Sequence, residues 1–236
     1  GGNIGYGTIE SALRRLRQVF RWGYKEGFLS RDYGTWIPRP KGKPLPKGAP
    51  DPSCLKQLFD GANNTDKPIR NKAILAVLIG TAVRRAECVS IDIEDVRFLA
   101  SGGGQILIKK GKGSKPRFVV FDEIAGRFLS THLLMMAESG FSSGPLFLGK
   151  SKTRMLAKSL NGVIDNIVKQ AGLTGVIRGP HDLRRMFATY WSRQHRGEGY
   201  TQPLSMQLGH NDPKMTIHYR KQTIDDVEQV FVSPLE

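Results

Sequence analysis

A proline-rich segment near the N-terminus limits what this chain can fold into. Six of the thirteen prolines lie between Pro38 and Pro52, together with two glycines and four basic residues. Proline has no backbone N–H and a fixed φ, so the segment can continue neither a helix nor a central strand. We therefore expect an extended, basic linker over residues 38–52, which separates a short N-terminal part, 1–37, from a larger C-terminal part.

The N-terminal part is expected to contain a basic amphipathic helix. Over Thr8–Gly27 apolar side chains recur at spacings of three and four, while arginines and lysines fill much of the remaining surface, as in a helix with one apolar face. Residues 1–50 carry ten Lys and Arg and three acids, a net charge of +7, against +8 for the other 186 residues. The tryptophans Trp22, Trp36 and Trp191 are interpreted as core residues.

The composition indicates which class of partner the protein binds and in which kind of compartment it acts. The chain has 36 Lys and Arg against 21 acids, a net charge of +15 and a pI near 10.0, which favours a polyanionic partner. Cys54 and Cys88 stand apart from any Cys/His cluster, so we expect a reducing compartment and no metal site. The longest apolar run, Ala73–Val83, has 11 residues, too few for a membrane span of about 20. The chain begins without methionine, and we expect further sequence upstream.

Beyond the linker the pattern predicts helices interrupted by a small sheet. Ser53 is a candidate cap for a helix reaching Asp60, and Asp66 with Pro68 opens another that continues to Ile79. Two short β-branched and aromatic runs flank a glycine-containing turn and predict a hairpin; they span residues 105–109 and 116–121. Apolar spacing predicts further helices at 123–138, 153–171, 181–195, 203–208, 213–219 and 224–232. The expected fold is mainly α with a small antiparallel β-sheet (α+β).

Three short motifs contain residue types that suit phosphoryl transfer. They are R-x-x-E at Arg84–Glu87, H-x-L-R at His181–Arg184 and L-G-H-x8-Y at Leu208–Tyr219. Guanidiniums donate paired hydrogen bonds to phosphate oxygens, which carry more charge in a pentavalent transition state than in the diester. Arg84 and Arg184 are therefore candidates for a phosphate clamp. His181 lies three residues before Arg184, so both share one helix face.

Each motif alone has an ordinary explanation. Arg84 and Glu87 could be a surface ion pair three residues apart, and a lysine in a glycine turn is usually solvated. Tyr219 competes with Tyr190 and Tyr200, and a tyrosine on an amphipathic helix is most often half-buried core. The occurrence of all these motifs in one order, in a strongly basic chain, favours catalysis over coincidence.

In this order the motifs resemble those of the tyrosine recombinase (phage integrase) family, over about Asp51 to Tyr219. The matching boxes are T-A-V-R-R-A-E from Thr81, G-K-G-S-K-P-R from Gly111, H-D-L-R, and L-G-H with a tyrosine shortly after. Ala82 stands where the family usually has glycine. We expect this difference to alter the local backbone while leaving the arginine and glutamate of the box in register.

The resemblance implies a role for each matching residue. Tyr219 is the nucleophile, which attacks a DNA phosphate and leaves a 3′-phosphotyrosyl bond and a free 5′-hydroxyl. Lys112 is the general acid that protonates the leaving 5′-oxygen, and His181 assists proton transfer from the tyrosine. His210 hydrogen-bonds a phosphate oxygen, and Glu87 organises the pocket around the first arginine.

The resemblance also implies a domain organisation. Residues 1–37 match the end of a helical core-binding domain, and residues 53–222 match the catalytic domain. An apolar stripe in the tail, 223–236, predicts a short helix that docks either on its own domain or on a neighbouring subunit.

The implied partner is double-stranded DNA with a specific recombination site, bound by a homo-tetramer that needs no cofactor, neither ATP nor a metal ion. Candidate DNA contacts are basic residues of the first helix, the linker and the hairpin: Arg14, Arg17, Arg21, Lys41, Lys43, Lys115 and Arg117. We expect a cytoplasmic, nucleoid-associated enzyme without membrane attachment. Two alternatives stay open: a type IB topoisomerase with the same residue types, and a DNA-binding protein without turnover.

Overall fold

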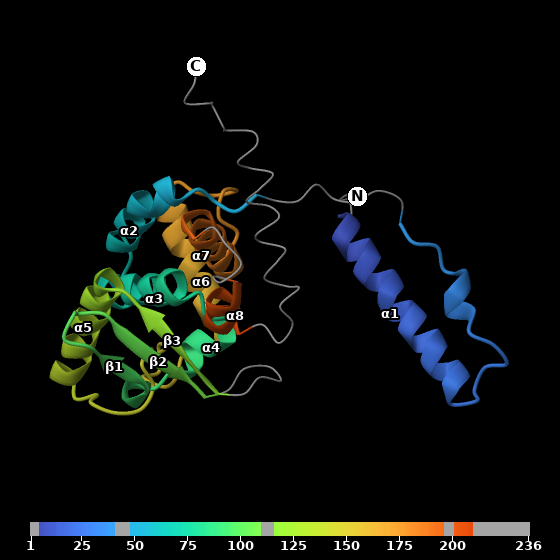
Figure 1. The fold of residues 1–236 in the computed structure, drawn as a ribbon, viewed down its shortest axis with the longest axis horizontal. Coiled ribbons are helices and arrows are strands. Elements are labelled where there is room, and N and C mark those ends of the chain that lie inside the picture. The colour runs from blue at the N-terminus through green and yellow to red at the C-terminus, as the bar shows by residue number, and fades with distance from the viewer. Residues whose placement is uncertain (1–4, 41–47, 110–115, 196–200, 210–236) are drawn as a thin grey trace, which may run out of the picture. The chain divides into compact units, whose positions relative to one another are not determined.

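A computed structural model describes residues 5–40, 48–109, 116–195 and 201–209 of the chain (Figure 1). It divides into two compact units, Gly1–Gly48 and Ala49–Glu236. The boundary between the units falls inside the segment predicted to be a linker. No helix of the described residues is long and apolar enough to cross a membrane.

The first unit consists of one long helix and a returning segment. Helix α1 (Tyr6–Lys25) is followed by the 3-10 turn η1 (Tyr33–Trp36), which packs back against it. The guanidinium of Arg17 donates to the carbonyls of Ile37 and Pro38 at 3.2 and 2.8 Å. These two bonds fasten the returning chain along the helix.

The prediction that Trp22 and Trp36 are core residues is wrong within this unit. Their exposed fractions are 56% and 65%, because one helix and a short turn cannot enclose large side chains. Trp22 instead lies against Phe28, and Trp36 meets Tyr33 edge to face. Arg31 lies over the Trp36 ring, 4.6 Å from its centroid, in a cation–π contact.

The second unit is mainly helical with a small antiparallel sheet, which confirms the predicted fold class. Its helices are α2 (Leu55–Asn63), α3 (Pro68–Thr81), α4 (Arg85–Ser90), α5 (Glu123–Glu138), α6 (Ala157–Gln170), α7 (Pro180–Gln194) and α8 (Thr201–Leu208), with 3-10 turns η2 (Pro52–Cys54) and η3 (Ile93–Asp95). Its strands are β1 (Val96–Phe98), β2 (Gly104–Ile108) and β3 (Arg117–Phe121).

Helix α3 forms the centre of this unit. Its residues from Ala73 to Leu78 are all buried, as expected for a helix that is apolar around its whole circumference. It packs against α2, α5, α7 and β3 (Figure 1). Pro68 occupies its first turn, where a missing N–H costs nothing.

The sheet has the strand order β1-β2-β3, and both pairs are antiparallel. Strands β2 and β3 form the predicted hairpin, with Gln105 opposite Val120. Strand β1 is not predicted from the sequence, because it has only three residues and none of them is fully buried. In the part of the chain that the structure describes, β3 is therefore an edge strand of the sheet.

Most helix boundaries agree with the sequence, and the differences have local causes. Helix α5 has the predicted bounds, and the Asp122 carboxylate caps it by accepting from the N–H of Ala125. Asp51, and not Ser53, caps the turn before α2. Helix α6 starts at Ala157 instead of residue 153, because Arg154 is bridged to Leu148 and bonded to the carbonyls of Val89 and Ile91.

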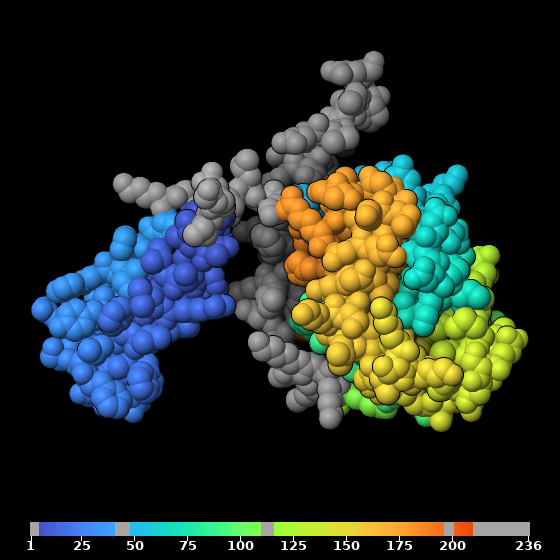
Figure 2. All heavy atoms as spheres, turned by 180° about the vertical axis from the view of Figure 1, so that it is seen from behind, coloured from blue at the N-terminus to red at the C-terminus, as the bar shows by residue number. Residues whose placement is uncertain are grey.

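Seen from behind, residues of α6 and of the segment after it cover much of the visible face of this unit (Figure 2). The inward face of α6 carries its buried residues Leu160, Ile164, Ile167 and Val168. The helices predicted at 213–219 and 224–232 lie outside the described residues.

The central position of α3 predicts that substitutions in it lower the stability of the protein. Leu75 is 0% exposed, so Leu75→Ala removes buried methyl groups and leaves a cavity, and the free energy of unfolding should fall by about 2–5 kcal/mol. Leu134 on α5 is 66% exposed, and Leu134→Ala should change it by no more than about 0.5 kcal/mol. Urea unfolding of both variants makes the comparison, and equal losses would contradict the assignment of α3 to the core.

Candidate active site

Arg184 lies where three helices meet. It sits on α7, is 4% exposed, and donates from Nη1 to the carbonyl of Ala82 and from Nη2 to the carbonyl of Leu208, both at 2.6 Å. The first carbonyl follows the end of α3 and the second belongs to the last residue of α8. The guanidinium is therefore held by the backbone of two other elements.

Arg84 reaches the same point from another direction. It is the residue before α4, and its Nη2 donates to the carbonyl of Gly209 at 2.9 Å. Leu208 and Gly209 are consecutive, so the carbonyls that anchor the two arginines lie one residue apart at the end of α8. The structure thus brings together the two arginines that the sequence proposed as a phosphate clamp.

Glu87 is the buried carboxylate of the site, with an exposed fraction of 2%. It accepts from the backbone N–H and Nη1 of Arg84 at 2.7 and 3.0 Å, and from Nη1 and Nη2 of Arg117 at 3.0 and 2.9 Å. Burial by itself would raise its pKa, but the hydrogen bonds from Arg117 and Arg84 and the charge of Arg117 hold the pKa below the ordinary value. Glu87 is therefore ionised at neutral pH.

Arg117, a DNA-contact candidate in the sequence, belongs to this cluster in the structure. Its side chain is 13% exposed and pairs bidentately with Glu87. Along β3 the side chains of Val119 and Phe121 are buried while Phe118 is exposed, so Arg117 falls on the inward face by the two-residue alternation of a strand. That alternation was the signal in the sequence that could have placed it.

Two unusual backbone conformations shape the site. Ala82 is fully buried with φ 53° and ψ 27°, a left-handed conformation that aims its carbonyl at Arg184. Ala82 thus adopts a backbone conformation that glycine favours, so the replacement of glycine by alanine does not change the direction of the chain here. Arg84 and Glu87 keep their register in the motif. Gly209 has φ 60°, and a Cβ there would lie 2.5 Å from the guanidinium carbon of Arg117. Only glycine fits.

His181 lies in the first turn of α7, one turn from Arg184 and exposed. Partial desolvation lowers its pKa, and the positive charges of Arg184 and Arg185 lower it further, against the opposing effect of Asp182. The imidazole is therefore mainly neutral at pH 7 and able to accept a proton. Asp182 itself accepts from the backbone N–H of Arg178 and from Arg185, which fixes the start of the helix.

The remaining predicted residues divide into two groups. Arg14 and Arg21 are exposed on α1, whereas Arg17 is half-buried and bonded to the returning chain. Outside the described residues lie the catalytic candidates Lys112, His210 and Tyr219 and the DNA-contact candidates Lys41, Lys43 and Lys115. Among the rival tyrosines, Tyr190 is 51% exposed on α7.

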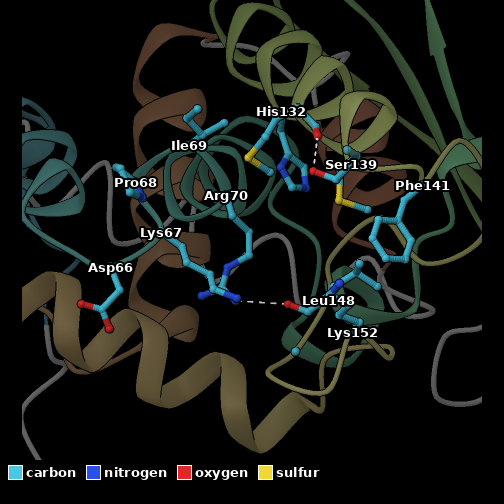
Figure 3. A pocket seen from close by; sticks show the side chains of 13 residues that line it. Asp66, Lys67, Pro68, Ile69, Arg70, His132, Ser139, Phe141, Leu148 and Lys152 are labelled. Atoms are coloured by element: carbon cyan, nitrogen blue, oxygen red, sulfur yellow. Dashed lines mark hydrogen bonds between the residues drawn. The ribbon is translucent and has the colours of Figure 1, made fainter.

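A separate cavity lies at the opposite end of α3 (Figure 3). It has a volume of about 400 Å³ and is lined by the start of α3 and the end of α5, with Arg70, His132 and Phe141 among its residues. Helix α3 has 14 residues and is therefore about 20 Å long; the cavity lies at its first residues, whereas Ala82 and Arg84 follow its last residue. The cavity is therefore distinct from the candidate active site.

Residues 51–225 match the sequence profile of the phage integrase family. The chain belongs to this family of tyrosine recombinases. It is 28% identical over 233 residues to tyrosine recombinase XerC of Oceanobacillus iheyensis, which covers 95% of this chain and 73% of the relative. It is also 28% identical over 231 residues to tyrosine recombinase XerD of Mycobacterium tuberculosis, which covers 93% and 71%.

Solved structures of recombinases share the fold. The XerH site-specific recombinase bound to a palindromic difH substrate, in its post-cleavage complex, has a TM-score of 0.75 at 20% identity, over 96% of this chain and 67% of that one. The Tn1549 transposon integrase in complex with transposon right end DNA has a TM-score of 0.72 at 16% identity, over 97% and 80%. As a tyrosine recombinase, this chain is an enzyme that breaks and rejoins DNA strands.

The buried carboxylate predicts a specific dependence of stability on pH. Glu87→Gln leaves two guanidiniums without their charge partner and should lower the free energy of unfolding at pH 7 by about 3 kcal/mol. Because the folded-state pKa of Glu87 is lowered, its contribution is present at neutral pH and lost as the pH falls through that pKa. The difference between wild type and variant should therefore narrow below about pH 4.

Urea unfolding at a series of pH values measures this difference. Glu123→Gln is the control, because Glu123 forms an exposed ion pair with Arg127, which contributes at most about 0.5 kcal/mol. A variant–wild type difference for Glu87 that stays constant from pH 7 to pH 3 would contradict the role of its charge.

Proposed function

We propose that this enzyme cuts and rejoins double-stranded DNA at a specific recombination site through Tyr219. The tyrosine oxygen attacks the scissile phosphorus, the bond to the 5′-oxygen breaks, and a 3′-phosphotyrosine and a free 5′-hydroxyl result. The observation that carries the proposal is the anchoring of Arg84 and Arg184 on the carbonyls of Leu208 and Gly209. Leu208 and Gly209 immediately precede His210 and lie eleven and ten positions before the tyrosine.

The charges of the site suit a phosphodiester. Arg84, Arg184 and Arg117 contribute three positive charges against the single negative charge of Glu87, so the cluster keeps a net positive charge. Bonds within the described residues use two of the five N–H groups of Arg84, whose side chain is 37% exposed. Donors of this kind stabilise the additional charge on the phosphate oxygens in the transition state.

The proton steps follow from the neutral imidazole and from the family pattern. A tyrosine with a pKa near 10 is a poor nucleophile at neutral pH, and His181 in its neutral form accepts the proton that Tyr219 must lose. Lys112 donates a proton to the departing 5′-oxygen, and His210 donates a hydrogen bond to a phosphate oxygen. Both roles rest on the resemblance of their motifs.

The proposed reaction uses neither ATP nor a metal ion. The phosphotyrosyl ester retains the energy of the cleaved phosphodiester, so the 5′-hydroxyl of another strand can displace the tyrosine directly. Guanidiniums supply the charge stabilisation that a metal ion provides in many nucleases. No cofactor is therefore part of the proposal.

The N-terminal unit is proposed to hold the DNA as the last part of a core-binding domain. Arg14 and Arg21 are exposed on α1, and together with Lys41 and Lys43 they would neutralise phosphates without reading sequence. The solved structures of the XerH recombinase with difH substrate and of the Tn1549 integrase with transposon right end DNA are complexes with DNA, which supports duplex DNA as the partner.

We propose a homo-tetramer on paired recombination sites, since strand exchange joins four strands. The tail, 223–236, docks on a neighbouring subunit in this proposal and couples the active sites of the assembly. An enzyme with this substrate acts in the cytoplasm, on the nucleoid.

The nucleophile is the most direct test. A pool of nicked duplexes with randomised sequence is incubated with the enzyme, and covalently bound DNA is isolated by denaturing electrophoresis and sequenced. We expect the wild type to yield one adduct per cleaved strand, and Tyr219→Phe to bind the recovered duplex with unchanged affinity and form no adduct.

Tyr190→Phe provides the matched control and should retain the adduct. Peptide mapping that assigns the adduct to Tyr190 or Tyr200, or an adduct that persists in Tyr219→Phe, would overturn the assignment. Relaxation of supercoils by a monomer without exchange between two duplexes would indicate a topoisomerase instead.

A further inference from the structure

Gln207 makes a set of hydrogen bonds that none of the recognised motifs accounts for. It is the second-last residue of α8, and its Oε1 accepts from the backbone N–H of Val120 at 3.1 Å. Its Nε2 donates to the carbonyl of Val120 at 2.8 Å and to the carbonyl of Thr81 at 3.3 Å. One side chain thus connects α8, the strand β3 and the end of α3.

The two bonds to Val120 complete the edge of the sheet. Among the described strands, β3 pairs with β2 alone, and Val120 lies opposite Gln105. On the other side, the amide of Gln207 presents an acceptor to the N–H and a donor to the C=O of the same residue, as a neighbouring strand would. A glutamate at this position could not donate, and a lysine could not accept.

The third bond links two segments that hold a catalytic arginine. Thr81 immediately precedes Ala82, and Gln207 immediately precedes Leu208. Within the described residues, the carbonyls of Ala82 and Leu208 both accept from the Arg184 guanidinium, each at 2.6 Å. Gln207 therefore links the two backbone segments whose carbonyls accept hydrogen bonds from Arg184.

We propose that Gln207 is a positioning residue that acts through Arg184. By tying the end of α8 to Thr81 and to β3, its amide fixes the spacing of the two carbonyls and hence the orientation of the guanidinium toward the scissile phosphate. Small misplacements of a catalytic group reduce rates strongly. The inference rests on the proposed function, because it assigns Gln207 to the same phosphate site.

The test measures single-turnover formation of the covalent adduct on the recovered nicked duplex. Gln207→Met keeps the length of the side chain and removes all three hydrogen bonds, so the cleavage rate should fall on the order of 10- to 100-fold. DNA affinity should stay unchanged. Gln202→Met is the matched control, because Gln202 is exposed on the same helix, and it should cleave at the wild-type rate.

A double-mutant cycle separates positioning from a general structural role. If Gln207 acts through Arg184, the loss caused by Gln207→Met should largely vanish in an Arg184→Lys background, since there is no guanidinium left to orient. Losses that multiply in the double variant would overturn the proposal. So would a wild-type rate for Gln207→Met alone.

Folding is checked independently of activity. Gln207→Met should speed hydrogen exchange at the N–H of Val120, while thermal unfolding shows a folded protein at the assay temperature. If this variant does not fold, Gln207→Glu replaces it, because glutamate is nearly isosteric with glutamine and still loses both donated bonds. We again expect a slower cleavage rate that largely disappears as a separate effect in the Arg184→Lys background. A wild-type enzyme that forms no adduct would refute the proposed function itself, a result distinct from a normal rate in the Gln207 variants.

Discussion

The buried carboxylate of Glu87 is the interaction on which the rest of the site depends. It fixes Arg84 through both its backbone and its side chain and binds Arg117 through two parallel bonds, so the start of α4 and the strand β3 are joined at one point. A carboxylate at 2% exposure is costly unless it is fully paired. Arg84 and Arg117 provide this pairing, and the same hydrogen bonds fix the positions of their own side chains.

Arg184 is positioned in a different way, and the difference has a chemical consequence. Within the described residues, its guanidinium donates to two neutral backbone carbonyls, both at 2.6 Å. Carbonyls orient a guanidinium without cancelling its charge, whereas Glu87 neutralises part of the charge of the other pair. The site therefore combines rigid placement with a net positive charge, which is the arrangement that binding of a phosphodiester transition state requires.

The fold class, the hairpin, the bounds of α5 and the association of Arg84 with Arg184 could be predicted from the sequence, because apolar spacing and motif order carry them. The inward position of Arg117 was missed, although strand alternation contains that signal. The anchoring role of the Leu208 and Gly209 carbonyls has no sequence signal, since every residue has a carbonyl and only tertiary structure aims it. The prediction that Trp22 and Trp36 are core residues fails because hydrophobicity alone does not show whether a side chain of α1 or η1 is enclosed by its neighbours.

The central claim is that Arg84 and Arg184 stabilise negative charge on the scissile phosphate. The direct measurement compares adduct formation by Arg84→Ala and Arg184→Ala on two nicked duplexes, one with an ordinary scissile phosphate and one with a methylphosphonate, in which a methyl group replaces a charged oxygen. On the phosphate, each variant should be slower than wild type by about 10²–10³-fold. On the uncharged methylphosphonate, the deficit of at least one variant should shrink by an order of magnitude or more. Equal deficits on both substrates for both variants would contradict the account.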